Sequence, residues 1–336
     1  MTNAIAVHGV TRTFGRIKAL NDLSFAVAEG SILGLLGRNG AGKTTIMSII
    51  AGQDRPSSGG VEVLGAAPFE NASVLSQISY VRDNQRYPDD YKLHHVLRIA
   101  PDFAPNWNAD VAAELVDGFR IPGKARIKKL SRGQLSSIAI VLGIASRSPV
   151  TLLDEPYLGL DITARALFHD VLIRDYAAHP RTIVLSTHLI EESERLFDHV
   201  VIIDRGTVVA DSPTDELQGL AFTVSGTADA VGRLAAGRTV LRSHAIGGLR
   251  SVTVRGGLDD TMRADARAAG VQVAPVTLPE LVVAFGEYEP DSSEKPRRSG
   301  SARVGAPAEE KVVAGADASG GLVAAGEPTA AKKGTH

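Results

Sequence analysis

The sequence predicts an α/β fold with a mostly parallel sheet, followed by a smaller α+β module. Three observations predict it. In residues 1–220, short β-branched runs alternate with longer helical patterns. From Ala221 onward the pattern changes to the order β-α-β-β-α-β. No apolar run reaches the roughly 18 residues that a membrane-spanning helix needs.

The central strands are predicted by apolar runs of buried-strand length: Ile32–Leu36, Thr151–Leu153, Thr182–Ser186 and Val200–Ile203. Such runs are apolar throughout because helices cover both faces of a parallel sheet. The last run continues through Asp204-Arg205-Gly206 into Thr207–Val209, which predicts a hairpin that turns at the glycine.

A helical segment interrupts the strands at residues 89–129. Val96–Ile99 and Val111–Phe119 have helical spacing, and Pro101 is expected to mark a helix boundary. We therefore expect an α/β domain over 1–220 with a helical subdomain at about 86–146.

The rest of the chain divides in two. Residues 221–289 predict a split ferredoxin-like α+β domain, with a terminal helix at Leu278–Phe285. Residues 290–336 contain no aromatic residue and no isoleucine, so they cannot bury enough apolar surface to fold. We expect them to be a disordered tail.

Composition excludes several functions. Charge is nearly balanced, with 36 Lys and Arg against 38 Asp and Glu, so the sequence lacks the basic surplus of a general nucleic-acid binder. The absence of cysteine excludes disulfides, thiolate metal sites and cysteine nucleophiles. The N-terminus shows no signal-peptide pattern, which predicts a cytosolic chain.

A phosphate-binding loop follows the first apolar run. Residues 37–44, GRNGAGKT, fit G-x-x-x-x-G-K-[ST] between a strand and a helical pattern. Glycines let backbone N–H groups approach an anion, and the helix N-terminus adds its positive dipole. Lys43 supplies a charge for the β- and γ-phosphates and Thr44 a Mg²⁺ ligand. The predicted ATP-binding residues are Gly37, Arg38, Asn39, Gly40, Ala41, Gly42, Lys43, Thr44 and Thr45.

Two carboxylates end the apolar strand at 150–154. Ligands of parallel sheets bind at the carboxyl ends of the strands, so Asp154 and Glu155 are expected at the ligand edge. Asp154 is predicted to hold Mg²⁺ through water, and Glu155 to polarise the attacking water. The alternatives are a chance glycine loop and an ordinary acidic strand end, but the two motifs together favour nucleotide hydrolysis.

Three further motifs carry a family resemblance. Residues 130–134, LSRGQ, resemble the LSGGQ signature of ATP-binding cassette (ABC) ATPases, with Arg132 in place of the first glycine. Gly159-Leu160-Asp161 is similar to the family's D-loop, and Ser186-Thr187-His188 to its switch-histidine loop. The motifs occur in the family's order over about residues 5–217, and the chain resembles the ATPase subunits of ABC-2-type exporters.

The resemblance implies a mixed P-loop ATPase core that acts as a head-to-tail dimer around two MgATP. Lys43, Glu155 and His188 would then be the catalytic residues, with Asp161 in the D-loop. The signature residues, which would act from the opposite subunit, are Ser131, Arg132, Gly133 and Gln134. The implied partners are a second copy or a paralogous ATPase subunit and a transmembrane permease at the cytoplasmic face of the membrane, with no nucleic acid. Export of a drug, antibiotic or lipid-like cargo is the implied transport.

Three assignments stay open at this point. Phe14 falls where the family stacks an aromatic on adenine, although a strand-end core position would also suit it. The family's Q-loop commonly reads Tyr-Val-Pro-Gln, whereas here Asp83 takes the Mg²⁺-contacting position and Gln85 is the alternative. Trp107, in a Pro-Asn-Trp-Asn stretch, is either part of the permease surface or a packing anchor.

Other functions fit the sequence less well. A non-transport ABC ATPase acting on nucleic acid or ribosomes would usually carry a second cassette, a long coiled coil or a zinc insertion, and none is visible. A small-molecule P-loop kinase would leave the signature and the D-loop unexplained.

Overall fold

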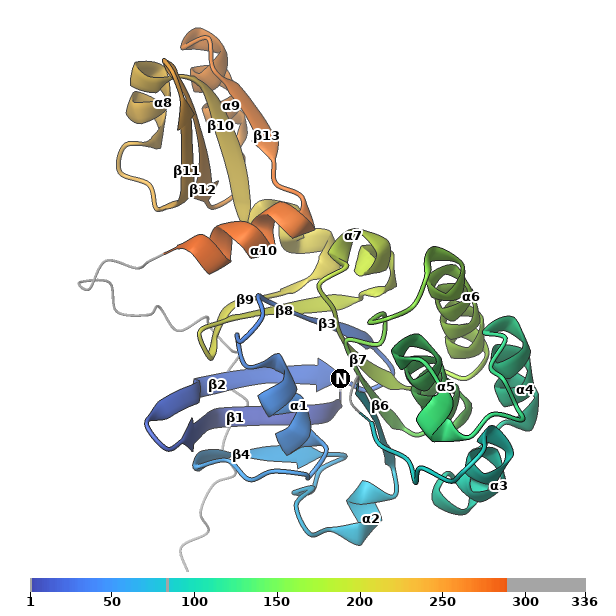
Figure 1. Ribbon diagram of the computed structural model, residues 1–336. Coiled ribbons are helices and arrows are strands. Elements are labelled where there is room, and N and C mark those ends of the chain that lie inside the picture. The colour runs from blue at the N-terminus through green and yellow to red at the C-terminus, as the bar shows by residue number, and fades with distance from the viewer. Residues whose placement is uncertain (1, 83–84, 289–336) are drawn as a thin grey trace, which may run out of the picture. The chain divides into compact units, whose positions relative to one another are not determined.

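The computed structural model describes residues 2–82 and 85–288, and its central element is a six-stranded sheet (Figure 1). The strand order is β5-β6-β7-β3-β8-β9. Neighbouring strands are parallel except β8 and β9, which form an antiparallel hairpin. The predicted buried strands and the hairpin are confirmed. The strands are β3 (Ile32–Leu36), β5 (Ile78–Arg82), β6 (Val150–Asp154), β7 (Thr182–Ser186), β8 (His199–Asp204) and β9 (Thr207–Pro213).

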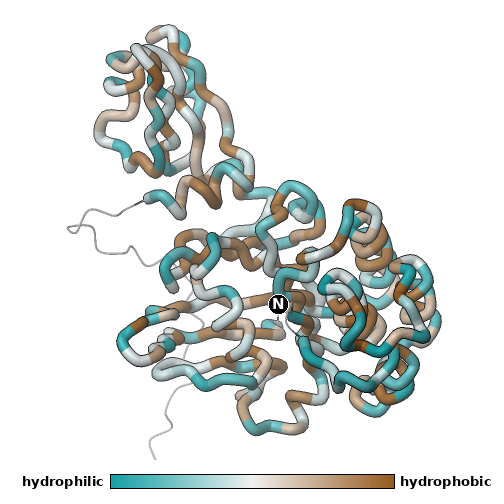
Figure 2. The backbone as a smooth tube through the Cα atoms, viewed as in Figure 1, coloured by the Kyte–Doolittle hydropathy of each residue, from teal (hydrophilic) through white to brown (hydrophobic). Residues whose placement is uncertain are grey.

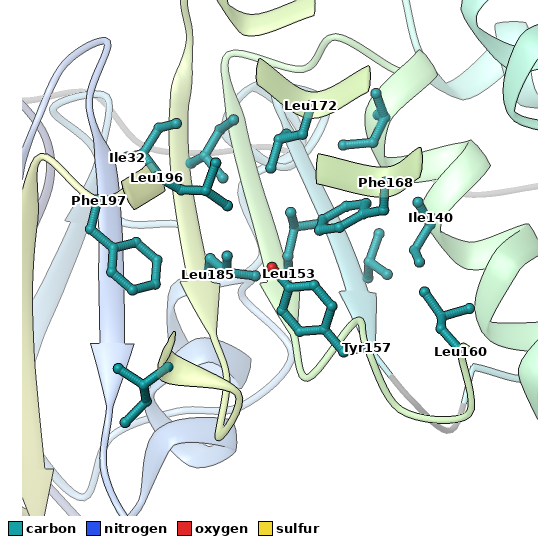
Figure 3. Packing of buried hydrophobic residues seen from close by; sticks show 14 of the residues in the cluster. Ile32, Ile140, Leu153, Tyr157, Leu160, Phe168, Leu172, Leu185, Leu196 and Phe197 are labelled. Carbon is teal, nitrogen blue, oxygen red and sulfur yellow. The ribbon is translucent and has the colours of Figure 1, made fainter. Parts of the chain in front are cut away.

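Each face of this sheet has its own hydrophobic core. Ile32 and Leu36 of β3 belong to one core, whereas Leu33 and Leu35 belong to the other, as the period of two in a strand requires. Helices α5 (Arg132–Ala145) and α6 (Ile162–Ala178) contribute to the first core. Figure 3 shows Phe168 of α6 close to the strand residues of this core.

The opposite face is covered by helix α1 (Lys43–Ile50) and by a second, antiparallel sheet. That sheet has the order β2-β1-β4, with strands β1 (Asn3–Phe14), β2 (Ile17–Ala28) and β4 (Ser58–Val63). The short elements α2 (Ala72–Leu75), α7 (Ile190–Ser193), η2 (Glu194–Leu196) and η3 (Thr214–Gly219) complete this part of the chain. Hydrophobic stretches follow the central strands, whereas hydrophilic and hydrophobic stretches alternate along the surrounding helices (Figure 2).

The predicted helical segment contains α3 (Leu93–Phe103), α4 (Ala109–Gly118) and η1 (Ile127–Lys129), and α5 follows it. One expectation was wrong: Pro101 does not end a helix but lies inside α3. The helix tolerates it because it lies in the final turn, where one missing N–H removes a single hydrogen bond and the helix ends at Phe103.

The C-terminal elements form a third sheet with the order β11-β12-β10-β13, antiparallel throughout. The sequence of elements is the predicted β-α-β-β-α-β, followed by a helix. Their bounds are β10 (Ala221–Thr227), α8 (Ala228–Ala235), β11 (Val240–Ile246), β12 (Leu249–Arg255), α9 (Asp260–Ala268), β13 (Gln272–Pro275) and α10 (Leu278–Glu287). Phe222, Val231, Val252 and Met262 lie in a separate small core.

Contacts group residues 1–289 as one compact unit, so a domain boundary at residue 220 stays a prediction. The predicted tail, 290–336, lies outside the described residues. Among the described helices, none combines the length and the apolarity that crossing a membrane requires.

Candidate active site

The loop between β3 and α1 has a backbone shape that requires glycine. Gly37, Gly40 and Gly42 have φ values of 144°, 82° and 112°. A Cβ on Gly37 would lie 2.2 Å from the carbonyl oxygen of Ile203, and one on Gly42 would lie 2.6 Å from Leu20 Cδ2. The predicted cradle is therefore present as a preformed loop at the N-terminus of α1, where the helix dipole favours an anion.

Lys43 begins α1 and its side chain turns back into the loop. Its Nζ donates to the carbonyl oxygen of Gly37 at 2.7 Å and to that of Arg38 at 3.3 Å. Burial lowers the pKa of Lys43, while the charges of Glu155 and Asp154 oppose that shift. An ammonium group held among loop carbonyls in this way is placed to neutralise phosphate oxygens.

A cavity of about 500 Å³ opens beside this loop. It is lined by Gly37, Arg38, Asn39, Gly40, Ala41, His188, Asp204, Arg205 and Gly286. Thr44 is exposed in the first turn of α1, and Thr45 is half-buried beside it. The glycine loop, Lys43 and the Thr44 hydroxyl together fit a nucleoside triphosphate with Mg²⁺.

Asp154 is buried at the carboxyl end of β6 and is held from both sides. The Ser186 hydroxyl donates to its Oδ1 at 2.5 Å, and the Tyr80 hydroxyl lies 3.5 Å from its Oδ2. Burial is the main cause that raises the pKa of Tyr80 to about 12. The sequence did not predict that Ser186 and Tyr80 contact Asp154, although both residues lie on strands that pair with β6.

Glu155 lies between a lysine and a histidine from two different elements. Its Oε1 is 3.8 Å from Lys43 Nζ, and its Oε2 is 2.7 Å from His188 Nδ1. Its φ of 50° is a left-handed backbone conformation that a non-glycine residue rarely adopts, and strain of this kind is concentrated at functional sites. The structure thus brings together the three side chains that the sequence nominated as catalytic.

The signature motif opens α5 with a capping box. The Ser131 side chain accepts from the backbone N–H of Gln134 at 3.2 Å, and the Gln134 side chain accepts from that of Ser131 at 2.9 Å. Arg132 is exposed, so a side chain fits at this position. Gly133 is different, because a Cβ there would lie 2.3 Å from the carbonyl oxygen of Gly159.

This contact joins the signature to the D-loop of the same chain. Asp161 caps α6 at the end of that loop, where its side chain accepts from the backbone N–H of Ala164 at 2.8 Å. Ile162, the next residue, is 84% exposed.

The remaining predicted residues lie elsewhere. Phe14 is at the end of β1 with the Arg12 guanidinium 4.4 Å above its ring, and 48% of it is exposed. Asp83 lies outside the described residues. Gln85 lines a groove of about 340 Å³ together with Phe103 and Trp107, apart from the lining of the cavity at the phosphate loop.

No group of three or more His, Asp and Glu side chains able to hold a metal ion is found in the described part of the chain. Thr44 and Asp154 remain as candidate Mg²⁺ ligands, an arrangement suited to an ion that is shared with phosphates and water.

Comparison with known proteins gives a consistent result. Residues 20–158 match the family described as ABC transporter. An uncharacterized ABC transporter ATP-binding protein of Methanocaldococcus jannaschii is 33% identical over 214 residues, which cover 62% of this chain and 77% of the relative. The doxorubicin resistance ATP-binding protein DrrA of Mycobacterium tuberculosis is 32% identical over 225 residues, 64% of this chain and 67% of the relative.

Solved structures agree on the fold. A structure described as the ATP-binding subunit of an ABC transporter has a TM-score of 0.58 and 26% identity, covering 65% of this chain and 92% of its own. A dimeric ATP-binding cassette bound to ADP and Pi has a TM-score of 0.54 at 21% identity, over 62% of this chain and 98% of its own. The chain therefore belongs to the family of ABC transporter ATP-binding proteins, and it is a nucleotide-binding ATPase with an ABC-type core.

Proposed function

We propose that the loop at residues 37–44 binds MgATP and that Glu155 polarises the water that attacks the γ-phosphate. The observation that carries this assignment is the Glu155 carboxylate, held between Lys43 and His188 at the carboxyl edge of the central sheet. A carboxylate fixed at both oxygens in this way has little freedom to turn away from a bound water.

The chain's residues divide the work of hydrolysis. Lys43 neutralises charge on the phosphates, and Glu155 accepts the proton of the attacking water as the γ-phosphorus–oxygen bond to ADP breaks. His188 orients Glu155 from the opposite side. Thr44 and Asp154, with Asp83 as a further candidate, would hold Mg²⁺, which supplies positive charge against the phosphate oxygens.

The test is Glu155→Gln, with Glu62→Gln on the exposed face of β4 as the matched control. MgATP binding should persist, whereas turnover should fall by at least about 100-fold because the amide cannot accept the proton. Hydrolysis at the wild-type rate in Glu155→Gln would overturn the assignment.

We also propose that two copies close around two MgATP, each supplying its signature to the other. Ser131 and Arg132 are exposed at the N-terminus of α5, where a second phosphate tail could be bound. Ile162, beside the D-loop, offers an apolar contact for a partner. Light scattering with ATP should show a dimer for Glu155→Gln and a monomer for Glu155→Gln combined with Ile162→Glu. A dimer in both would contradict this arrangement.

We propose that the groove lined by Gln85, Phe103 and Trp107 binds a helix of a separate permease. Phe103 is 80% exposed there. Gln85 Oε1 and the Tyr87 hydroxyl are buried without a hydrogen-bond partner among the described residues. Such a groove suits a helix with apolar side chains and a polar group. In this proposal Trp107 has both of the roles considered for it above, because it lines the permease groove and also packs against the core.

Co-purification with the permease tests this docking. Phe103→Asp should abolish it and leave the ATPase activity of the isolated chain unchanged. Ile173→Asp, at a half-exposed position of α6, is the control and should co-purify normally. Normal co-purification of Phe103→Asp would exclude the groove.

We propose export as the direction of transport and a drug, antibiotic or lipid-like molecule as cargo, at the cytoplasmic face of the membrane. Support comes from relatives named for doxorubicin resistance and for Nod factor export, the latter from Rhizobium johnstonii at 33% identity over 214 residues. Cells that express the chain with its permease should accumulate less of a fluorescent drug than cells with Glu155→Gln. Equal accumulation of every compound tried, or greater uptake, would contradict export.

A further inference from the structure

Helix α10 follows the C-terminal sheet in sequence but packs with the ATPase core. Leu278, Leu281 and Phe285 belong to the core that also contains Phe197 and Ile202, whereas the strands β10 and β12 contribute to a separate small core. The helix contacts α7 and β8 of the ATPase part. Its position is therefore fixed by burial against α7, which begins two residues after His188, and against β8 of the hairpin beside the phosphate loop.

The last turn of α10 meets the phosphate loop at Arg38. The guanidinium Nη1 of Arg38 donates to the carbonyl oxygen of Gly286 at 3.1 Å. This carbonyl lies at the negative end of the helix dipole, which favours a cation. A Cβ at residue 286 would lie 2.5 Å from Arg38 Cδ, so with alanine there the Arg38 side chain has to shift from its present position.

Gly286 also lines the cavity at the phosphate loop, together with Gly37–Ala41 and His188. The C-terminal segment thus supplies part of the rim around the place where nucleotide is proposed to bind.

Two further contacts tie the same turn of α10 to the C-terminal sheet. The Arg255 guanidinium of β12 lies 5.7 Å from the centre of the Phe285 ring, and Arg242 Nε of β11 donates to Glu287 Oε2 at 2.8 Å. A displacement of that sheet would therefore be transmitted to Gly286.

We propose that Gly286 is a positioning residue for nucleotide binding: α10 holds the Arg38 side chain, and the C-terminal module thereby sets the affinity of the phosphate loop for MgATP. The carbonyl oxygens of Gly37 and Arg38 both accept from Lys43 Nζ, so a shift of the Arg38 backbone reaches the lysine directly. The inference rests on the proposed nucleotide site at residues 37–44. A purely structural role for the contact would stabilise the docked helix and leave nucleotide affinity unchanged.

Gly286→Ala in the full chain tests the proposal, with Gly232→Ala as the matched control. Gly232 lies in helix α8, and a Cβ there meets no atom within 4 Å. Calorimetric titration with MgATP should give a dissociation constant about fivefold higher for Gly286→Ala and a wild-type value for Gly232→Ala. A lowered melting temperature with wild-type affinity in Gly286→Ala would overturn the proposal.

A double-mutant cycle distinguishes the loss of the contact between Arg38 and Gly286 from a general loss of stability. Arg38→Ala should weaken binding by a similar factor, and Gly286→Ala should add nothing once Arg38 is truncated, because the clash is gone. Arg38→Lys, which can still donate to the Gly286 carbonyl, should recover most of the affinity. Additive losses, or no recovery with lysine, would contradict positioning through this contact.

Lys43→Ala distinguishes an error in the proposed nucleotide site from an error in the proposed positioning by α10. If Lys43→Ala binds MgATP as the wild type does, the proposed nucleotide site is wrong and the inference falls with it. If Lys43→Ala loses binding while Gly286→Ala retains wild-type affinity, only the positioning by α10 is refuted.

Discussion

Replacing Gly133 by alanine should damage hydrolysis far more than ATP binding. The new Cβ would lie 2.3 Å from the Gly159 carbonyl oxygen, and ordinary van der Waals contact begins at 3.4 Å. The signature and D-loop backbones must therefore separate by about 1.1 Å. The position of the Cβ is fixed by the backbone of residue 133, and the oxygen belongs to the backbone of Gly159, so no side-chain rotation relieves the clash.

The expected magnitudes follow from that displacement. A misplacement of about 1 Å in groups that assemble an active site costs on the order of 100-fold in rate. Overpacking of this kind also lowers the free energy of unfolding by about 1–3 kcal/mol. MgATP binding to the phosphate loop of the single chain should be unchanged, because Gly133 is not among the residues that line that cavity.

Steady-state phosphate release, MgATP titration and urea unfolding together check these expectations. Gly123→Ala is the control, since a Cβ at Gly123 meets no atom within 4 Å. If Gly133→Ala hydrolyses ATP at the wild-type rate and has wild-type stability, the close approach of the signature to the D-loop is needed for neither hydrolysis nor stability, and the prediction is wrong.

Three further predictions concern polar groups that are buried or half-buried in the ATPase core. Tyr157→Phe removes the 2.6 Å hydrogen bond to His169 Nε2 and should lower the free energy of unfolding by about 1–3 kcal/mol, measured with urea; an unchanged midpoint would contradict it. Burial lowers the pKa of His169 below its ordinary 6.5, so the unfolded chain binds more protons and stability should fall as pH drops below about 6.5. His169→Gln should flatten that slope in melting curves, and an identical pH dependence would refute the assignment. Asp175→Asn leaves the buried Arg181 and the half-buried Arg147 without their shared carboxylate and should cost about 3–5 kcal/mol in urea unfolding; a loss below about 1 kcal/mol would show that these ion pairs are dispensable.

Local sequence patterns predicted most of the strands and helices. Strands such as β3 and β7 are mostly apolar and are buried along their whole length, so their bounds were predicted correctly. Strand β11 is different, because its residues 242–246 are exposed and have no alternating apolar pattern, and the strand is stabilised by pairing with β12. Tertiary hydrogen bonding, absent from any local pattern, decides such cases.

The same distinction separates the predicted site residues from the missed ones. The phosphate loop could be predicted because its chemistry is confined to consecutive residues that must form one shape. It could not be predicted from the sequence that residue 132 accepts a side chain whereas residue 133 does not. That difference depends on which of the two residues faces Gly159 in the folded chain.

The contact between Arg38 and Gly286 spans 248 residues, and neither residue marks it in the sequence. Nothing in the sequence of the C-terminal module looks catalytic. Yet a module without catalytic groups can influence catalysis by ending a buried helix at the rim of the cavity beside the phosphate loop. The requirement is geometric: a glycine that admits the arginine, and a carbonyl that accepts from it. The effect on MgATP affinity of a single methyl group at residue 286 is therefore the measurement that decides whether this module regulates the ATPase or only stabilises it.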